Sequence, residues 1–150
     1  MFDYQIRGTP LVLRITETGH PFFKNAVNRI IDSAIRQVVR KIIAGSGKEP
    51  IENGAFTLSL ANIDMRIMAP GNEKLTYSYL GDVLAGIWQY MNEEWSSFRE
   101  MVFDIILFVF VDRWEYIGYG YLLKVRPVPP PEPSSSSLNR NASLALNEIE

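Results

Sequence analysis

The one histidine of the chain, His20, is the only side chain that could act as the base of a serine–histidine–acid arrangement. The serine of many such enzymes lies in a Gly-x-Ser-x-Gly turn, which this sequence lacks. His20 also directly precedes Pro21, a residue typical of the first helical position, so we expect His20 to lie at a helix start. The absence of cysteine excludes disulfides, thiolate chemistry and cysteine-ligated metals, and one histidine cannot form a histidine-rich metal site.

Two further motifs are each better explained by structure than by catalysis. Gly45-Ser46-Gly47-Lys48 resembles the end of a phosphate-binding loop, but it follows an expected helix rather than a strand, and Glu49 follows the lysine. We interpret it as a turn that ends the helix. Glu93 and Glu94 are sequence neighbours, so their side chains diverge and cannot form an acid–base pair. We therefore predict no catalytic residue, no metal and no cofactor.

The final part of the folded chain is unusually aromatic. Core packing explains some of this, but aromatic side chains are also favoured at interface cores and in apolar pockets. Our candidate interface or ligand-binding residues are Phe108, Phe110, Trp114, Tyr116, Tyr119 and Tyr121, together with Phe22 and Phe23 near the start of the first helix. Asn141 begins an Asn-Ala-Ser glycosylation acceptor, which matters only on a secretory route.

Composition limits the class of protein. The chain has 150 residues, of which 47% are hydrophobic, and a formal net charge of −2. The length fits one globular domain, and the balanced charge is not that of a nucleic-acid-binding protein, which needs a basic surplus. The longest apolar run, Ile105–Val111, is too short to span a membrane. No apolar run of signal-peptide length follows Met1, so we expect either a cytoplasmic protein or a secreted one whose signal peptide is absent from this chain.

The composition changes abruptly at Arg126. Prolines and then serines dominate from there, and too little apolar material follows to offset the entropy of ordering. We predict a single domain over residues 1–125 and a disordered tail over 126–150.

Hydrophobic periodicity places the elements of that domain. Alternation at Leu11, Leu13 and Ile15 predicts a strand with one wet face, and Phe2–Ile6 fits a short edge strand. Between residues 54 and 67 the alternation changes phase at Ala61-Asn62, which fits a bulged strand or a tight hairpin; we favour the bulge. The remaining expected elements are a helix from Pro21 to Gly45, a helix opening at Thr76, and a hairpin of Met101–Val111 and Glu115–Val125 with its turn at Asp112-Arg113. The Thr76 hydroxyl is the expected cap of the second helix, and Leu75 and Leu80 occupy the two positions of a hydrophobic staple.

Both expected helices carry informative apolar patterns. In the first helix, apolar pairs repeat every four residues from Phe22/Phe23 to Ile42/Ile43. Because a helical turn has 3.6 residues, the apolar stripe shifts progressively around the helix. One sheet face cannot cover such a stripe, and its two ends must meet different partners or another subunit. The second has a narrow stripe that includes Trp88, and Gly81 would allow close approach of another helix.

The sum is an α+β two-layer sandwich of order β-α-β-α-β-β, with two helices on a mixed or antiparallel sheet. In the hairpin, alternation puts Trp114 and Tyr116 on one face of the second strand and Tyr119 and Tyr121 on the other. Gly118 and Gly120 lie inside that strand, where glycine usually marks close packing. Helices on both faces of the sheet would cover the hairpin, whereas helices on one face would leave the other face for a partner.

Several short segments resemble a pattern in small uncharacterised fungal proteins, many of them secreted. They are Gly8-Thr9, Leu75-Thr76-Tyr77, Val83–Ile87, Phe103-Asp104-Ile105 and Gly118-Tyr119-Gly120. The likeness spans residues 8–123 and contains no catalytic signature. It implies an α+β fold and a non-enzymatic role.

Our leading hypothesis is a non-enzymatic protein–protein interaction or self-assembly module, forming a homodimer or docking on another protein. The alternative is a carrier of a small apolar ligand, a lipid or an aromatic compound, held between the helices and the aromatic hairpin. An enzyme of unrecognised type ranks third.

Overall fold

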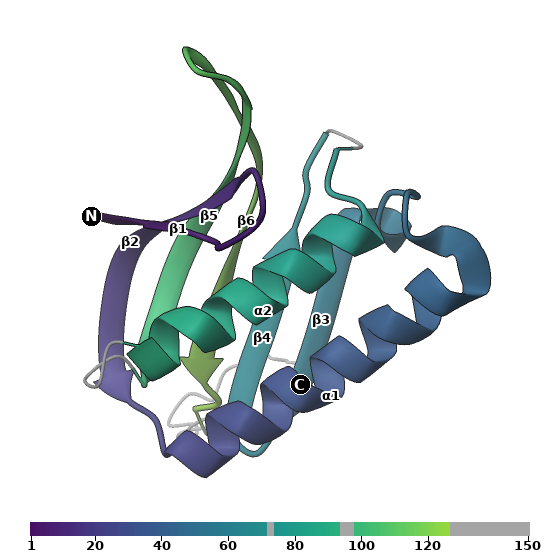
Figure 1. The fold of residues 1–150 in the computed structure, drawn as a ribbon. Helices are drawn as coiled ribbons and strands as arrows, with labels where there is room; N and C mark the ends of the chain where they lie inside the picture. The colour runs from purple at the N-terminus through teal and green to yellow at the C-terminus, as the bar shows by residue number, and fades with distance from the viewer. Residues whose placement is uncertain (72–73, 94–97, 127–150) are drawn as a thin grey trace, which may run out of the picture.

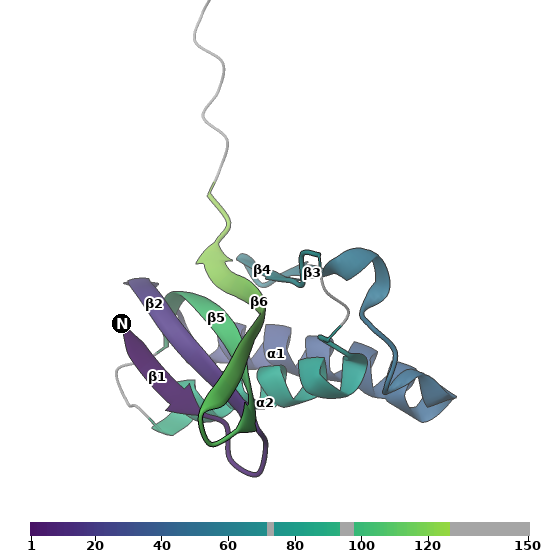
Figure 2. The ribbon, with the colours of Figure 1, turned by 90° about the horizontal axis from the view of Figure 1, so that it is seen from above.

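The computed structural model describes residues 1–71, 74–93 and 98–126, and these form an antiparallel six-stranded sheet with two helices (Figure 1). Both helices pack on the same face of the sheet (Figure 2). The predicted α+β sandwich is confirmed, with antiparallel strands in the order β1-β2-β5-β6-β4-β3. The strands are β1 (Phe2–Gln5), β2 (Leu11–Pro21), β3 (Ala55–Leu60), β4 (Ile63–Met68), β5 (Arg99–Phe110) and β6 (Arg113–Lys124), and the helices are α1 (Lys24–Lys41) and α2 (Tyr77–Glu93).

The hydrophobic core lies between the sheet and the helix pair. Alternate residues of the strands point toward the helices, as Leu11, Leu13 and Ile15 of β2 do, and all three are buried there. On the opposite face, no element within the described residues forms a second layer. The fold therefore leaves one side of an aromatic-rich sheet without a covering helix.

The expected start of α1 at Pro21 is wrong. His20 and Pro21 belong to β2, which extends to pair Pro21 with Arg99, and the backbone N–H of Phe22 donates to the carbonyl of Phe98 at 2.7 Å. The helix begins only at Lys24, after an extended Phe23 that makes no side-chain cap. Pairing with the neighbouring strand outweighs the local preference of proline for a helix start, because propensity is the weaker force.

The preferred bulge at Ala61-Asn62 is also wrong, and the hairpin alternative is what forms. β3 and β4 pair from Ala55↔Met68 to Leu60↔Ile63, and the two residues between them have φ angles of 54° and 64°. Two successive left-handed residues make the turn whose twist matches a two-residue hairpin. The fold therefore contains two strands between α1 and α2, where we favoured one. The short edge strand β1 is also present, ahead of the strands in the predicted β-α-β-α-β-β order.

The apolar stripe of α1 is covered only in its middle. The buried residues are Val27, Ile30, Ile31, Ala34 and Val38, whereas Phe23 at one end and Ile43 at the other are exposed. This matches the expectation that one sheet face cannot cover the whole stripe. After Lys41 the chain continues in a short π-helical turn (Ile42–Ser46) in which Gly45 has a φ angle of 96°, so the glycine ends the helix as expected.

The start of α2 follows its sequence signal. The backbone N–H of Tyr79 donates to the Thr76 hydroxyl at 3.3 Å, and Leu75 and Leu80 are both fully buried. This is the predicted cap with its hydrophobic staple. Trp88, which we placed on the buried stripe, is instead 46% exposed.

Two glycines of α2 should respond in opposite ways to the same substitution. A Cβ at Gly81 would lie 3.5 Å from Val38 and 3.7 Å from Ile42, an ordinary contact, whereas one at Gly86 would lie 2.5 Å from the buried Ile6. We expect Gly81→Ala to stabilise the fold by about 1 kcal/mol through helix propensity, and Gly86→Ala to destabilise it by about 1–3 kcal/mol through overpacking. Urea denaturation measures both, and equal effects would contradict the packing of α2 on Ile6.

Candidate functional site: the hairpin arm

The far end of the β5–β6 hairpin projects beyond the rest of the sheet (Figure 1). Pairing of β5 with β2 ends at Leu107, followed by one hydrogen bond from the Phe108 N–H to the Pro10 carbonyl at 2.8 Å, and pairing of β6 with β4 ends at Tyr119. Residues 108–116, here called the hairpin arm, therefore take part only in the pairing of β5 with β6 among the described strands. The turn lies at Val111-Asp112, one residue before the predicted position.

A bulge at Ile117 aligns the aromatic residues of β6. Ile105 pairs with Gly118 but Ile106 pairs with Tyr116, so Ile117 is skipped in the ladder and is buried in the core. A one-residue bulge shifts the alternation of side chains. Trp114 and Tyr116 consequently lie on the same face as Tyr119 and Tyr121, and our prediction that they lie on opposite faces is wrong.

This shared face is the one turned away from the helices. Tyr119 and Tyr121 pair with Asp104 and Val102, whereas the residues alternating with them in β6, Gly118 and Gly120, face the core. A Cβ at Gly120 would lie 2.8 Å from the ring of Phe103, so the glycine marks close packing, as predicted. Four aromatic side chains of one strand thus line the uncovered side of the sheet and lead out to the arm.

The arm exposes large apolar side chains where a monomer would ordinarily bury them. Phe110 is 68% exposed, Val111 94% and Trp114 50%, and Phe108, Val109 and Tyr116 are each more than a third exposed. Six large apolar or aromatic residues of one short segment are therefore exposed together, whereas exposed hydrophobic residues on a monomer are usually scattered singly. Such a surface is typical of a binding site.

The base of the arm is held by charged side chains. The guanidinium of Arg14 lies 5.0 Å from the centre of the Trp114 ring and forms a two-bond ion pair with Asp3, at 2.8 and 3.0 Å. On the other strand edge, the Lys74 ammonium donates to both carboxylate oxygens of Glu115, at 2.7 and 2.6 Å. These contacts fix the orientation of the arm relative to the body, because a cation on an indole face is attracted to it.

The same contacts set the protonation of the groups around the arm. Arg14 lowers the pKa of Asp3, and Lys74 lowers the pKa of Glu115, so both carboxylates are ionised at neutral pH. Burial, with the nearby Asp104 carboxylate, raises the pKa of Tyr116, so its phenol stays neutral and can donate a hydrogen bond. The arm therefore offers a neutral aromatic surface with charges confined to its edges.

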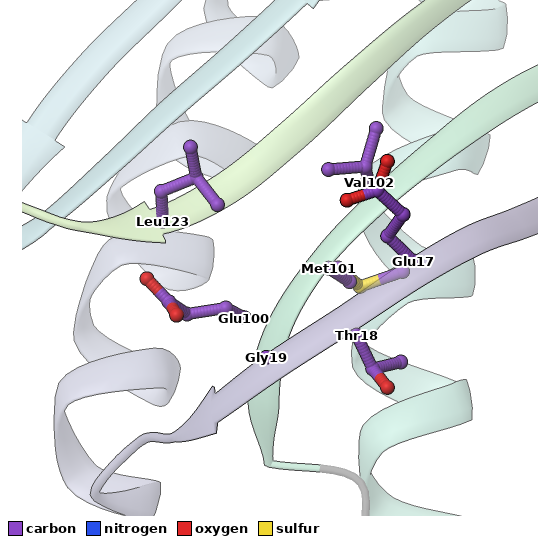
Figure 3. A pocket seen from close by; sticks show the side chains of 7 residues that line it. All are labelled: Glu17, Thr18, Gly19, Glu100, Met101, Val102 and Leu123. Carbon is purple, nitrogen blue, oxygen red and sulfur yellow. The ribbon is translucent and has the colours of Figure 1, made fainter.

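A buried carboxylate, Glu100, lies at the opposite end of the hairpin and was not singled out by the sequence. It is 4% exposed and lines a hollow of about 120 Å³ with Glu17, Gly19 and Leu123 (Figure 3). Its oxygens accept hydrogen bonds from the backbone N–H of His20 at 3.0 Å and of Lys124 at 2.8 Å, and from the Arg126 guanidinium at 3.1 and 3.3 Å.

These hydrogen bonds indicate that Glu100 has a structural role rather than a catalytic one. The hydrogen bonds from Arg126 and the two backbone N–H groups hold its pKa at about 2, against the opposing effect of burial. A carboxylate that holds its charge so firmly is a poor proton donor or acceptor near neutral pH. It joins the ends of β2, β5 and β6, and it places Arg126, which we assigned to the tail, within the folded part. The rest of the predicted tail lies outside the described residues.

The structure brings some candidate residues together and separates others. Phe108, Phe110, Trp114 and Tyr116 gather in the arm, and Tyr119 and Tyr121 continue along its strand. Phe22 and Phe23 lie away from the arm, at the other end of the sheet, where they line a separate hollow with the end of β6. Asn141 lies outside the described residues. The backbone of His20 is held by Glu100, and its side chain is exposed.

The described residues contain neither a metal-binding cluster nor a helix suited to cross a membrane. No cluster of three or more histidine, aspartate or glutamate side chains within them could hold a metal ion. None of their helices combines the length and the apolar character that crossing a membrane requires.

Sequence reasoning missed Glu100 because a lone acidic residue inside a strand gives no signal by itself. Its partner, Arg126, directly precedes the first proline of the tail, where composition predicts disorder.

Comparison of this chain with known protein families, with curated proteins and with solved structures finds no match.

Proposed function

We propose that the protein is a non-enzymatic interaction module that self-associates as a homodimer through its hairpin arm. The observation that carries this proposal is the exposed aromatic and aliphatic surface of residues 108–116 at the end of a projecting hairpin. An isolated two-stranded hairpin is only marginally stable in water, so an arm with apolar side chains gains stability when a partner covers it.

The size of the surface supports a second copy as the partner. The six exposed side chains of the arm can supply the apolar centre of a standard interface, in which each protein buries ~800 Å². A two-fold dimer uses the same patch on both copies, and the arm supplies both halves of such a contact. The aromatic residues are of the types that form the energetic centre of interfaces.

Sedimentation velocity of the full chain from about 1 to 100 μM tests the proposal, since interfaces of this size commonly give micromolar or tighter affinity. We expect the sedimentation coefficient to rise from that of a monomer to that of a dimer across the series. A monomer at every concentration, or an open-ended series of larger species, would overturn the proposal.

A further inference from the structure

We propose that the hollow at the opposite end of the sheet from the arm binds a small amphipathic carboxylate, such as a medium-chain fatty acid. This site is independent of the self-association proposed above. The hollow has a volume of about 390 Å³ and lies where the start of α1, the β3–β4 turn and the end of β6 meet. Its volume is within the range of about 300–1,000 Å³ typical of ligand pockets.

Its walls are mostly apolar. Ile63 and Phe22 form buried parts of the lining, Phe23 and Val125 extend it toward solvent, and Ala26 leaves space on the helix side. Phe23 is 85% exposed and does not belong to the described hydrophobic core. An apolar body placed in the hollow would cover both it and Val125, removing apolar surface from water.

The polar residues of the lining select for a negative charge. Lys124 and Asn62 line the hollow, and none of its lining residues is acidic. The Lys124 backbone N–H donates to Glu100, but its ammonium has no ion-pair partner among the described residues. A carboxylate head group would pair with this ammonium while the alkyl chain contacts Phe22 and Phe23. Ligand pockets commonly combine an apolar lining with a few polar groups that orient the ligand.

The lining is preformed by backbone contacts. The Val125 N–H donates to the Asn62 carbonyl at 2.9 Å, which ties the end of β6 to the β3–β4 turn, and the Phe22 N–H donates to the Phe98 carbonyl at 2.7 Å. Ala61 and Asn62 are held in the left-handed conformation of a tight turn. A ligand would therefore need little reorganisation of the backbone, which favours affinity.

Calorimetric titration of the full chain with decanoate and with uncharged decanol tests the site. We expect saturable binding of decanoate about five-fold or more tighter than that of decanol, because only the acid pairs with Lys124. Lys124→Met should remove this difference, whereas Lys48→Met, at an exposed lysine outside the hollow, should leave it unchanged.

Ala26→Trp, which fills the hollow, should weaken both ligands about ten-fold or more while urea denaturation reports the fold. If this variant does not fold, the methyl NMR signals of Ala26 and Ile63 in the unmodified protein should shift on adding decanoate. The absence of saturable binding, binding that Ala26→Trp does not weaken, or no shift of these methyl signals would each contradict the proposal.

Discussion

Replacing Trp114 by alanine is expected to weaken dimerisation about 30- to 100-fold, the effect of losing a central aromatic hot spot. Trp114 is half exposed in the single chain, is oriented by Arg14, and lies opposite Phe108 in the arm. In the proposed dimer its ring is covered on both sides, so its removal uncovers apolar surface and leaves a cavity. Sedimentation equilibrium measures the change in dissociation constant.

Trp88→Ala is the matched control for this experiment. Trp88 is 46% exposed, almost as much as Trp114, but it lies on α2, away from the arm. Removing it deletes the same amount of exposed indole without touching the proposed interface, so the dimer should persist unchanged. Equal weakening by both variants, or none by Trp114→Ala, would locate self-association elsewhere.

Replacing Glu100 by alanine is expected to lower the free energy of unfolding by about 2–4 kcal/mol, because buried partners of a charged group lose their hydrogen bonds. The variant leaves two backbone N–H groups, of His20 and Lys124, without their acceptor and frees Arg126. Glu17→Ala is the control, since Glu17 lines the same hollow but is exposed. Its effect should stay within about 0.5 kcal/mol.

The contribution of Glu100 should also depend on pH in a defined direction. Its pKa is lowered from 4.5 to about 2 in the folded protein, so the folded state favours the charged form. The stabilisation is fully present above the unfolded pKa and is lost as pH falls through the folded pKa; a gap of this size corresponds to at most about 3 kcal/mol.

Urea denaturation of the unmodified protein and of Glu100→Gln at several pH values measures this dependence. The difference in unfolding free energy between them should be constant above about pH 5.5 and shrink steadily toward pH 2. A difference that does not change over this range would mean that Glu100 has the same pKa in the folded and unfolded protein.

Structural features that depend on residues close together in the sequence were predicted better than features that depend on distant residues. Thr76 and the Leu75/Leu80 pair predicted the start of α2 because cap and staple contacts involve residues close in sequence. The helix start predicted at Pro21 was wrong, because the local preference of proline is outweighed by strand pairing with Arg99, a residue far along the chain. Such pairing has no signature at Pro21 itself.

In the candidate site, too, local patterns predicted some features and contacts between distant residues decided others. Aromatic composition alone marked residues 108–121 as a functional lead, and the apolar pattern alone predicted a hairpin. Alternation could not place the skipped residue Ile117, because a bulge is decided by how β5, β6 and the core fit together. That single residue puts Trp114 and Tyr116 on the same face as Tyr119 and Tyr121.

By itself, then, the sequence determined the α+β class, the hairpin and the absence of cysteine chemistry, since these depend on composition and short-range periodicity. Only the tertiary structure decided that both helices share one face, that the arm projects, and that Glu100 and Arg126 meet. Those features depend on contacts between residues distant along the chain. Strand order and packing set such contacts, and no local pattern encodes them.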